Sequence, residues 1–270
     1  MLVGSYNPIL VFFSFVVAVL ASYTALDMAG RVATSEGRAA RLWLVGGAFS
    51  MGLGIWSMHF IGMLAFSLPI SLGYDPLITA VSLAIAIGAS ALALWLVCQH
   101  EMPWSRLVQG ALLIGVGIAL MHYSGMAALR MQPGIDYHLG WLTASVLVAV
   151  LASGAALWLA FRLRANLHRM RLWRGLAALV MGLAIAGMHY TGMAAASFPE
   201  GSFCGASNGV DTNWLALLVI VLTLAVLAIT LIVSILDARL QSRTSVLASS
   251  LEKANSELMQ LALHDNLTRL

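Results

Sequence analysis

Long apolar runs separated by short polar segments form the main pattern of the chain. A bilayer core of about 30 Å requires roughly 20 apolar residues per spanning helix, and seven runs reach that length. They lie at residues 8–30, 42–67, 76–98, 107–129, 139–161, 173–196 and 214–236. The pattern predicts an all-α integral membrane protein with seven transmembrane helices in a domain of residues 1–236.

The distribution of cationic side chains predicts how these helices are oriented. Lys and Arg favour cytoplasmic loops, and Arg130 is the only cation on the side reached after the second, fourth and sixth runs. We therefore expect the N-terminus outside and the C-terminus inside. Charged residues make up 9% of the chain, against roughly a quarter in soluble domains, so the net charge of +3 reflects membrane topology and not nucleic-acid binding.

The same motif recurs in the second, fourth and sixth runs. It reads GLGIWSMHFIGM at residues 52–63, GVGIALMHYSGM at 115–126 and GLAIAGMHYTGM at 182–193. The copies start 63 and 67 residues apart, and each is followed by a proline at which the helix is expected to end: Pro69, Pro133 and Pro199. Three two-helix units and one additional helix account for the seven runs.

Each motif places its histidine on a face of small residues. At about 100° per residue, the first glycine, the isoleucine, the second glycine and the last methionine fall on the histidine face of the helix. Small residues allow transmembrane helices to approach closely. We expect the three motif helices to meet along these faces and to point their histidines at one another, in one layer toward the outer side.

An ionisable side chain inside a bilayer indicates a functional site by default. A single membrane histidine often only hydrogen-bonds a neighbouring helix, and methionine is a common core residue. Three copies at matched depth favour a metal site instead. The predicted ligands are the three histidines, with the methionines of the motifs as additional or alternative ligands: His59, His122, His189, Met63, Met126, Met193, Met58, Met121 and Met188.

Imidazole and thioether groups together favour copper, especially Cu(I), because they are soft and neutral ligands. Zinc bound by three histidines and haem with an axial His or Met remain alternatives. Retinal is excluded, because a Schiff base needs an intramembrane lysine and the only lysine is Lys253 in the tail. Phe60 replaces the tyrosine of the other two motifs, so a phenol ligand cannot be threefold.

Other polar residues near the spans give weaker signals. Asp27 lies near the inner end of the first run with Arg31 four residues later, a spacing that favours an ion pair or a capping contact over a proton relay. His138, in an outer loop, could join a metal site. The basic residues within 162–174 are expected to face anionic lipid headgroups of the bilayer.

The tail changes to a heptad pattern. Apolar or small residues with alternating gaps of four and three form one seam: Leu240, Thr244, Leu247, Leu251, Ala254, Leu258 and Leu261. This spacing predicts a cytoplasmic signalling helix at residues 237–262 that forms a parallel homodimeric coiled coil with helix seven. A single amphipathic helix packed on another surface is the alternative.

The three Met-His-aromatic-x-Gly-Met copies on seven helices resemble the MHYT sensor family, and the likeness covers residues 5–240. Residues 263–270, LHDNLTRL, look like the opening of a GGDEF diguanylate cyclase domain. The resemblance implies a sensor of the bacterial inner membrane, attached to a cyclic-di-GMP synthase or phosphodiesterase. Family members have been proposed to bind copper and to sense a diatomic gas such as oxygen, nitric oxide or carbon monoxide.

The expected function is therefore reception of a signal at a metal centre, without catalysis by these residues themselves. Two other classes remain. A copper or proton transporter would need further ligands stacked above and below the histidine layer. A structural membrane anchor would use its histidines only to hold helices together.

Overall fold

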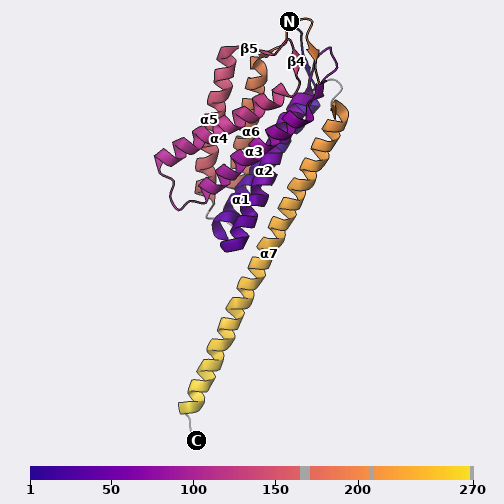
Figure 1. Ribbon diagram of the computed structural model, residues 1–270. Coiled ribbons are helices and arrows are strands. Elements are labelled where there is room, and N and C mark those ends of the chain that lie inside the picture. Colours follow the sequence, from indigo (N-terminus) through magenta and orange to yellow (C-terminus); the bar gives the residue numbers. More distant parts are fainter. Residues whose placement is uncertain (165–170, 207–209, 268–270) are drawn as a thin grey trace. The chain divides into compact units, whose positions relative to one another are not determined.

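The computed structural model describes residues 1–164, 171–206 and 210–267. Its helices are α1 (Pro8–Thr34), α2 (Gly37–Ala65), α3 (Pro76–Val97), α4 (Trp104–Ala127), α5 (Leu139–Leu163), α6 (Arg171–Ala195) and α7 (Thr212–Leu267) (Figure 1). All seven are long and apolar enough to cross a membrane. The predicted seven-helix membrane fold is confirmed, and each predicted run lies within or within two residues of a helix.

Four two-stranded sheets join the ends of the helices on one side of the bundle. They pair β1 (Ser5–Tyr6) with β2 (Phe66–Ser67), β3 (Gly73–Tyr74) with β8 (Val210–Asp211), β4 (Met131–Gln132) with β7 (Phe203–Cys204), and β5 (Asp136–Tyr137) with β6 (Ala196–Ser197). All four pairs are antiparallel. We call this the outer end of the bundle, following the orientation that the cationic residues predict.

The odd helices begin at this end through a threefold backbone contact. In each repeat, the backbone N–H of the residue before an odd helix donates at 2.8 Å to a carbonyl oxygen at the end of the next even helix along the chain. The pairs are Asn7 with Ala65, Asp75 with Ala128, and His138 with Ala195. Asn7 and Asp75 also cap α1 and α3 with their side chains, as Asn and Asp commonly do at helix starts. The three repeats thus fix the depth of their helices in the same way.

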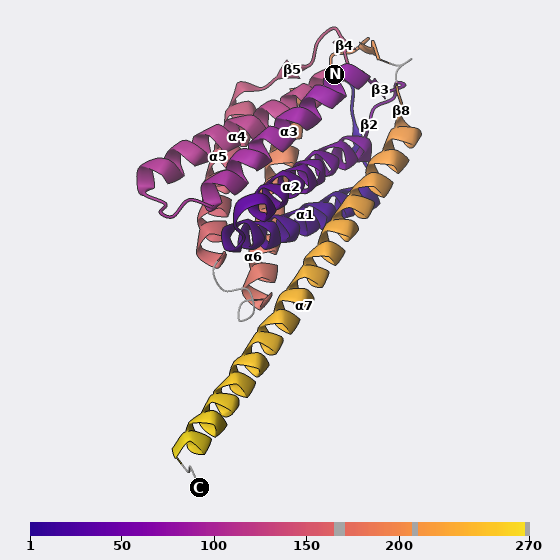
Figure 2. The same cartoon turned by 60° about the horizontal axis from the view of Figure 1, so that its bottom comes forward.

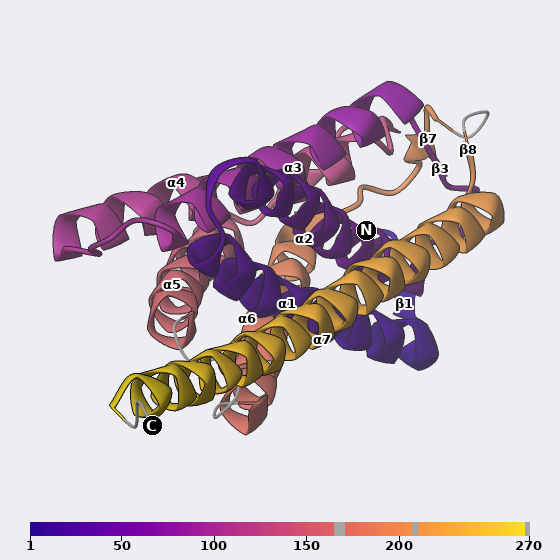
Figure 3. The same ribbon diagram turned by 90° about the horizontal axis from the view of Figure 1, so that it is seen from below.

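Helices α1 to α6 form a closed ring in which each helix packs on the next and α6 returns to α1. Figures 2 and 3 show α2 between α1 and α3. The first glycine of each motif lies against the backbone of the following odd helix: Gly52 at Ile87, Gly115 at Val150 and Gly182 at Val19. A side chain at any of these glycines would collide with that backbone, so close helix approach explains the small residues.

Helix α7 belongs to two compact units, residues 1–230 and 231–270. Within the first unit, Ser57 of α2 hydrogen-bonds Thr223, and Thr230 donates to Ser50 at 3.0 Å. In the second unit the helix continues without a break, with Gln241 donating to Asp237 one turn earlier at 3.1 Å. The leucines of the heptad seam, among them Leu251, are exposed. The coiled coil and the predicted boundary at residue 236 stay predictions.

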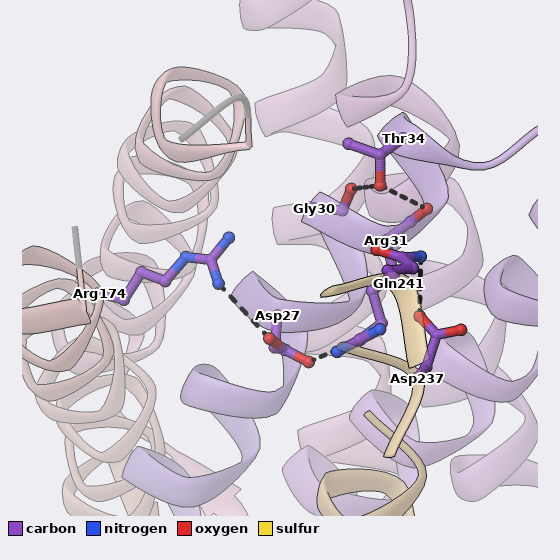
Figure 4. A network of polar contacts seen from close by, with 7 residues as sticks. All are labelled: Asp27, Gly30, Arg31, Thr34, Arg174, Asp237 and Gln241. Carbon is purple, nitrogen blue, oxygen red and sulfur yellow. Dashed lines mark hydrogen bonds and ion pairs between the residues drawn. The ribbon is translucent and has the colours of Figure 1, made fainter. Parts of the chain in front are cut away.

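The predicted ion pair at the inner end is confirmed and has a third member (Figure 4). Arg31 Nε lies 3.1 Å from Asp27 Oδ2, and Arg174 Nη1 of α6 lies 3.4 Å from Oδ1 of the same carboxylate. The Arg174 side chain is only 4% exposed. The expectation that Arg174 faces lipid headgroups is therefore wrong, because this buried residue joins α6 to α1 through the partly exposed carboxylate of Asp27. Residues 165–170 of the same basic segment lie outside the described residues.

Candidate metal centre

The three motif histidines converge at the centre of the ring. His59 Nδ1 lies 3.1 Å from His189 Nδ1 and 3.1 Å from His122 Nδ1. One ring nitrogen from each residue lies within 4.8 Å of the other two, and all three residues are fully buried. The predicted meeting of the three histidines in one layer is confirmed. Among the described residues this is the only group of three His, Cys, Asp or Glu side chains close enough to share an ion.

A glycine of the neighbouring even helix makes room for each imidazole. Nε2 of His59 lies against Gly125 of α4, that of His122 against Gly192 of α6, and that of His189 against Gly62 of α2. A Cβ atom at any of these glycines would lie closer than 3.0 Å to the ring. Each glycine is three residues after the histidine of its own helix, so the motif supplies both an imidazole and the space for the next one.

Hydrogen bonding alone leaves this cluster incomplete. An imidazole nitrogen has one in-plane lone pair or one N–H, so His59 Nδ1 cannot form two good hydrogen bonds with both neighbours at once. The three Nε2 atoms have no hydrogen-bond partner among the described residues. These Nε2 atoms face the glycines, away from the centre. At the centre itself, both His122 Nδ1 and His189 Nδ1 compete for His59 Nδ1, and this arrangement favours a ligand bound by the three Nδ1 atoms.

The spacing of the Nδ1 atoms fits one small metal ion. Nitrogen ligands at about 2.0–2.1 Å from a metal lie about 3.3–3.6 Å apart in tetrahedral or trigonal geometry. His59 Nδ1 lies 3.1 Å from each of the other two Nδ1 atoms, a few tenths of an ångström below this range, and the ligand nitrogens of all three residues lie within 4.8 Å of one another. The residues thus fit a metal held by three Nδ1 atoms, with each Nε2 carrying the proton.

The aromatic residue of each motif packs beside its histidine and not into the metal position. The Tyr123 hydroxyl hydrogen-bonds Ser145 of α5 at 2.6 Å, and the Tyr190 hydroxyl hydrogen-bonds Ser14 of α1 at 2.9 Å. Phe60 has no hydroxyl. In that repeat Trp56 Nε1 donates to Ser82 of α3 at 2.9 Å instead. These serines and Trp56 were missed in the sequence, although Ser82 and Ser145 share the 63-residue period of the motif.

A second layer of phenols covers the motif aromatics on the outer side. Tyr74 packs on Phe60 with ring centroids 5.4 Å apart, and Tyr137 packs on Tyr123 at 5.3 Å. Burial raises the pKa of Tyr137 to about 12, helped by the Tyr123 phenol. Burial likewise raises the pKa of the Tyr74 phenol above its usual range. Both phenols stay neutral at physiological pH and shield the histidines without adding charge.

The methionines of the motifs are buried around this centre. All six candidate ligands are at most 4% exposed: Met58, Met63, Met121, Met126, Met188 and Met193. Met63, Met126 and Met193 lie one helical turn outward from the histidines on the same face. Their role as ligands stays a prediction. His138 does not join the cluster, because it precedes the first turn of α5 as the N-cap residue.

An apolar cavity of about 80 Å³ lies inward from the histidines. Met188, which directly precedes His189, and Ile55, Ile118 and Ile185, one turn inward from the histidines, line it together with aliphatic residues and two further methionines. Ser153 is its one polar residue besides these thioethers. The space is large enough for a small molecule but offers no charge or imidazole to an ion, so a hydrophobic compartment adjoins the histidine layer.

Comparison with known families explains the threefold architecture. Residues 52–110, 115–172 and 182–245 each match the MHYT family, described as the bacterial signalling protein N terminal repeat. The chain belongs to the MHYT family. Its repeats begin at the motif glycines and together cover most of the chain. The MHYT family and the seven apolar helices place the protein in the bacterial inner membrane, as the sequence predicted.

The chain is similar to longer proteins whose names refer to cyclic di-GMP turnover or signalling. The chain is 69% identical over 271 residues to the "Bifunctional diguanylate cyclase/cyclic di-GMP phosphodiesterase MucR" of Pseudomonas aeruginosa. It is 39% identical over 275 residues to "Cyclic di-GMP phosphodiesterase NbdA" of the same species, and 36% identical over 196 residues to "Signaling protein YkoW" of Bacillus subtilis.

The alignments cover 100%, 98% and 72% of this chain but only 40%, 35% and 24% of those relatives. No solved structure matches the chain. The chain corresponds to the MHYT sensor region of these longer relatives.

Proposed function

We propose that this MHYT region is a membrane sensor whose metal, copper in preference to zinc or haem, is held by Nδ1 of His59, His122 and His189. The observation that carries the proposal is the convergence of three buried Nδ1 atoms, in which His59 Nδ1 lies 3.1 Å from both of the others and cannot form a good hydrogen bond with both at once. Neutral imidazoles avoid burying a carboxylate in lipid, and the thioethers around them suit Cu(I). The bound metal would supply an open coordination position for an external ligand.

The sensed ligand is proposed to be a diatomic gas. The apolar cavity next to the histidines, of about 80 Å³, exceeds the roughly 30 Å³ that one water molecule occupies in the liquid. Its apolar walls favour a small apolar molecule over water. Oxygen, nitric oxide and carbon monoxide share this property, and each binds to reduced metals with an open position.

The output is proposed to run through α7 to an attached cyclic-di-GMP synthase or phosphodiesterase, in line with the printed names of MucR and NbdA. Ser57 lies two residues before His59 and hydrogen-bonds Thr223 of α7. A change of α2 at the metal therefore alters a direct polar contact with α7. The exposed leucine seam further along α7 supports a parallel homodimer that brings two output domains together.

A transporter is less well supported by the same geometry. A proton or a hard cation moving inward from the histidine layer meets a cavity with neither carboxylate nor imidazole, and a charge in such surroundings is costly. The thioethers of Met51, Met181 and Met188 in its lining suit a soft cation alone. The anchor hypothesis predicts that the histidines bind no metal at all, so the deciding measurement is metal content.

The test compares copper per chain in purified, detergent-solubilised protein without a histidine tag. Wild type should retain about one copper ion per chain after loading and dialysis. The His59→Ala, His122→Ala, His189→Ala triple variant should retain none while keeping its helical circular dichroism. The matched control His138→Ala removes an imidazole outside the cluster and should bind copper as wild type does. A copper-free wild type would reject the sensor and leave the anchor.

A further inference from the structure

On the outer side of the ring, the contact between α6 and α1 differs from the two other contacts between an even helix and the next odd helix, α2–α3 and α4–α5. We call these three contacts the seams of the ring. Residues 66–75 connect α2 directly to α3, and residues 128–138 connect α4 directly to α5. No such connection joins α6 to α1. There the N-terminal segment crosses, fixed by a backbone hydrogen bond of 2.8 Å from Leu2 to the carbonyl oxygen of Phe198. The α6–α1 seam is thus closed only by noncovalent contacts.

The aromatic cover is also looser at this seam. Tyr6, Tyr74 and Tyr137 hold equivalent positions, each directly before the N-cap residue of an odd helix. Tyr74 is 1% exposed, whereas Tyr6 is 44% exposed. The ring of Tyr6 is 6.0 Å from that of Tyr190, a wider separation than at the other two seams.

An outer cavity of about 370 Å³ opens under this looser cover. Its lining includes Tyr6, Phe66, Tyr190, Met193 and Ala194. Of the three methionines one turn outward from the histidines, Met193 is the one that this cavity reaches. A path therefore leads from the outer surface to a thioether that lies on the same helix face as His189.

We propose that this outer cavity is the entry route of a soft monovalent cation, Cu(I) or its analogue Ag(I), to the three histidines. This inference rests on the proposed metal centre. Met193 is the first protein ligand along the route, because thioethers bind soft cations without requiring a charged residue. The Tyr6 and Tyr190 rings flank the entrance.

The transfer is a ligand exchange that leaves the oxidation state unchanged. The cation loses its solvent or carrier ligand as the bond to Met193 Sδ forms, and loses the Met193 bond as imidazole Nδ1 lone pairs replace it. No electron moves. No proton is released when each imidazole already carries its proton on Nε2, the tautomer that the converging Nδ1 atoms require.

The test separates the rate of uptake from the final amount bound. Detergent-solubilised protein is mixed with Ag(I), quenched with a chelator at set times, and analysed for silver per chain by mass spectrometry. Ala194→Trp fills the cavity. Its matched control is Ala127→Trp, because Ala127 holds the same place five residues after His122 and is similarly exposed. Ala194→Trp should slow uptake at least tenfold without lowering the final stoichiometry, and Ala127→Trp should leave the rate unchanged.

Met193→Leu provides a second variant of similar volume. It removes the thioether and should also slow uptake. Equal uptake rates in wild type, Ala194→Trp and Met193→Leu would overturn the entry route while leaving the metal centre intact. If wild type binds no silver that depends on the three histidines, the proposed function itself fails, and the route fails with it.

Discussion

Replacing Gly192 by alanine adds one methyl group at the point where α6 meets the ring of His122. The new Cβ would lie closer than 3.0 Å to the imidazole, with Cδ2 at 2.9 Å. Nε2 is the nearest ring atom and lies closer still, so restoring an ordinary separation of about 3.5 Å requires the ring to retreat by roughly 1 Å. His122 Nδ1 would then leave the position it holds 3.1 Å from His59 Nδ1.

The size of the effect follows from the cost of overpacking. An added methyl group in a tightly packed interior costs about 1–3 kcal/mol. If this strain opposes the metal-bound geometry, copper affinity falls about 5- to 150-fold, since about 1.4 kcal/mol corresponds to a factor of ten. Strain that remains in the metal-free protein appears instead as a lower thermal stability, by several degrees.

The assay is a competition titration of Cu(I) against a chromophoric chelator, together with thermal unfolding in detergent. Gly187→Ala in the same helix is the matched control, because a Cβ at Gly187 meets nothing within 4 Å. It should leave both quantities unchanged or raise stability slightly, since alanine favours helix by up to about 1 kcal/mol. If Gly192→Ala binds copper as tightly as wild type and unfolds at the same temperature, the glycine does not position His122.

Three further changes test other parts of the structure. Asp27→Asn removes the carboxylate shared by two buried arginines and should lower the free energy of unfolding by about 3–5 kcal/mol, measured by thermal unfolding. Its control, Asp75→Asn, loses an ion pair to an exposed arginine but keeps a capping side chain, and should cost at most about 1 kcal/mol in the same assay. Tyr190→Phe loses one hydrogen bond and should cost about 0.5–1.5 kcal/mol with full copper content; loss of copper would instead identify the phenol as a ligand. Leu251→Cys should crosslink two copies of the chain with a thiol-reactive reagent if the heptad seam of α7 pairs. Ser249→Cys, on the opposite face of the helix, should not crosslink. Equal crosslinking at both positions would argue against the predicted coiled coil.

The sequence by itself determined the elements and the layer of candidate ligands. Apolar runs of about 20 residues predict membrane helices because the bilayer imposes their length, and all seven were found. The repeated motif predicted that His59, His122 and His189 meet at one depth, because equal spacing within equivalent helices gives equal height. Asp27 and Arg31 were predictable for the same reason, since residues four apart are neighbours on a helix.

Only the tertiary structure decided which groups meet across helices. Nothing in the sequence indicated that Gly125 of α4 receives His59 of α2, that Nδ1 and not Nε2 faces the centre, or that Arg174 reaches Asp27. Helical periodicity is a local property, whereas these contacts join residues 63 to 147 positions apart. In a membrane the lipid is as apolar as the protein core, so hydropathy does not mark which face of a helix points inward. The order of the six helices in the ring therefore came from the tertiary structure alone.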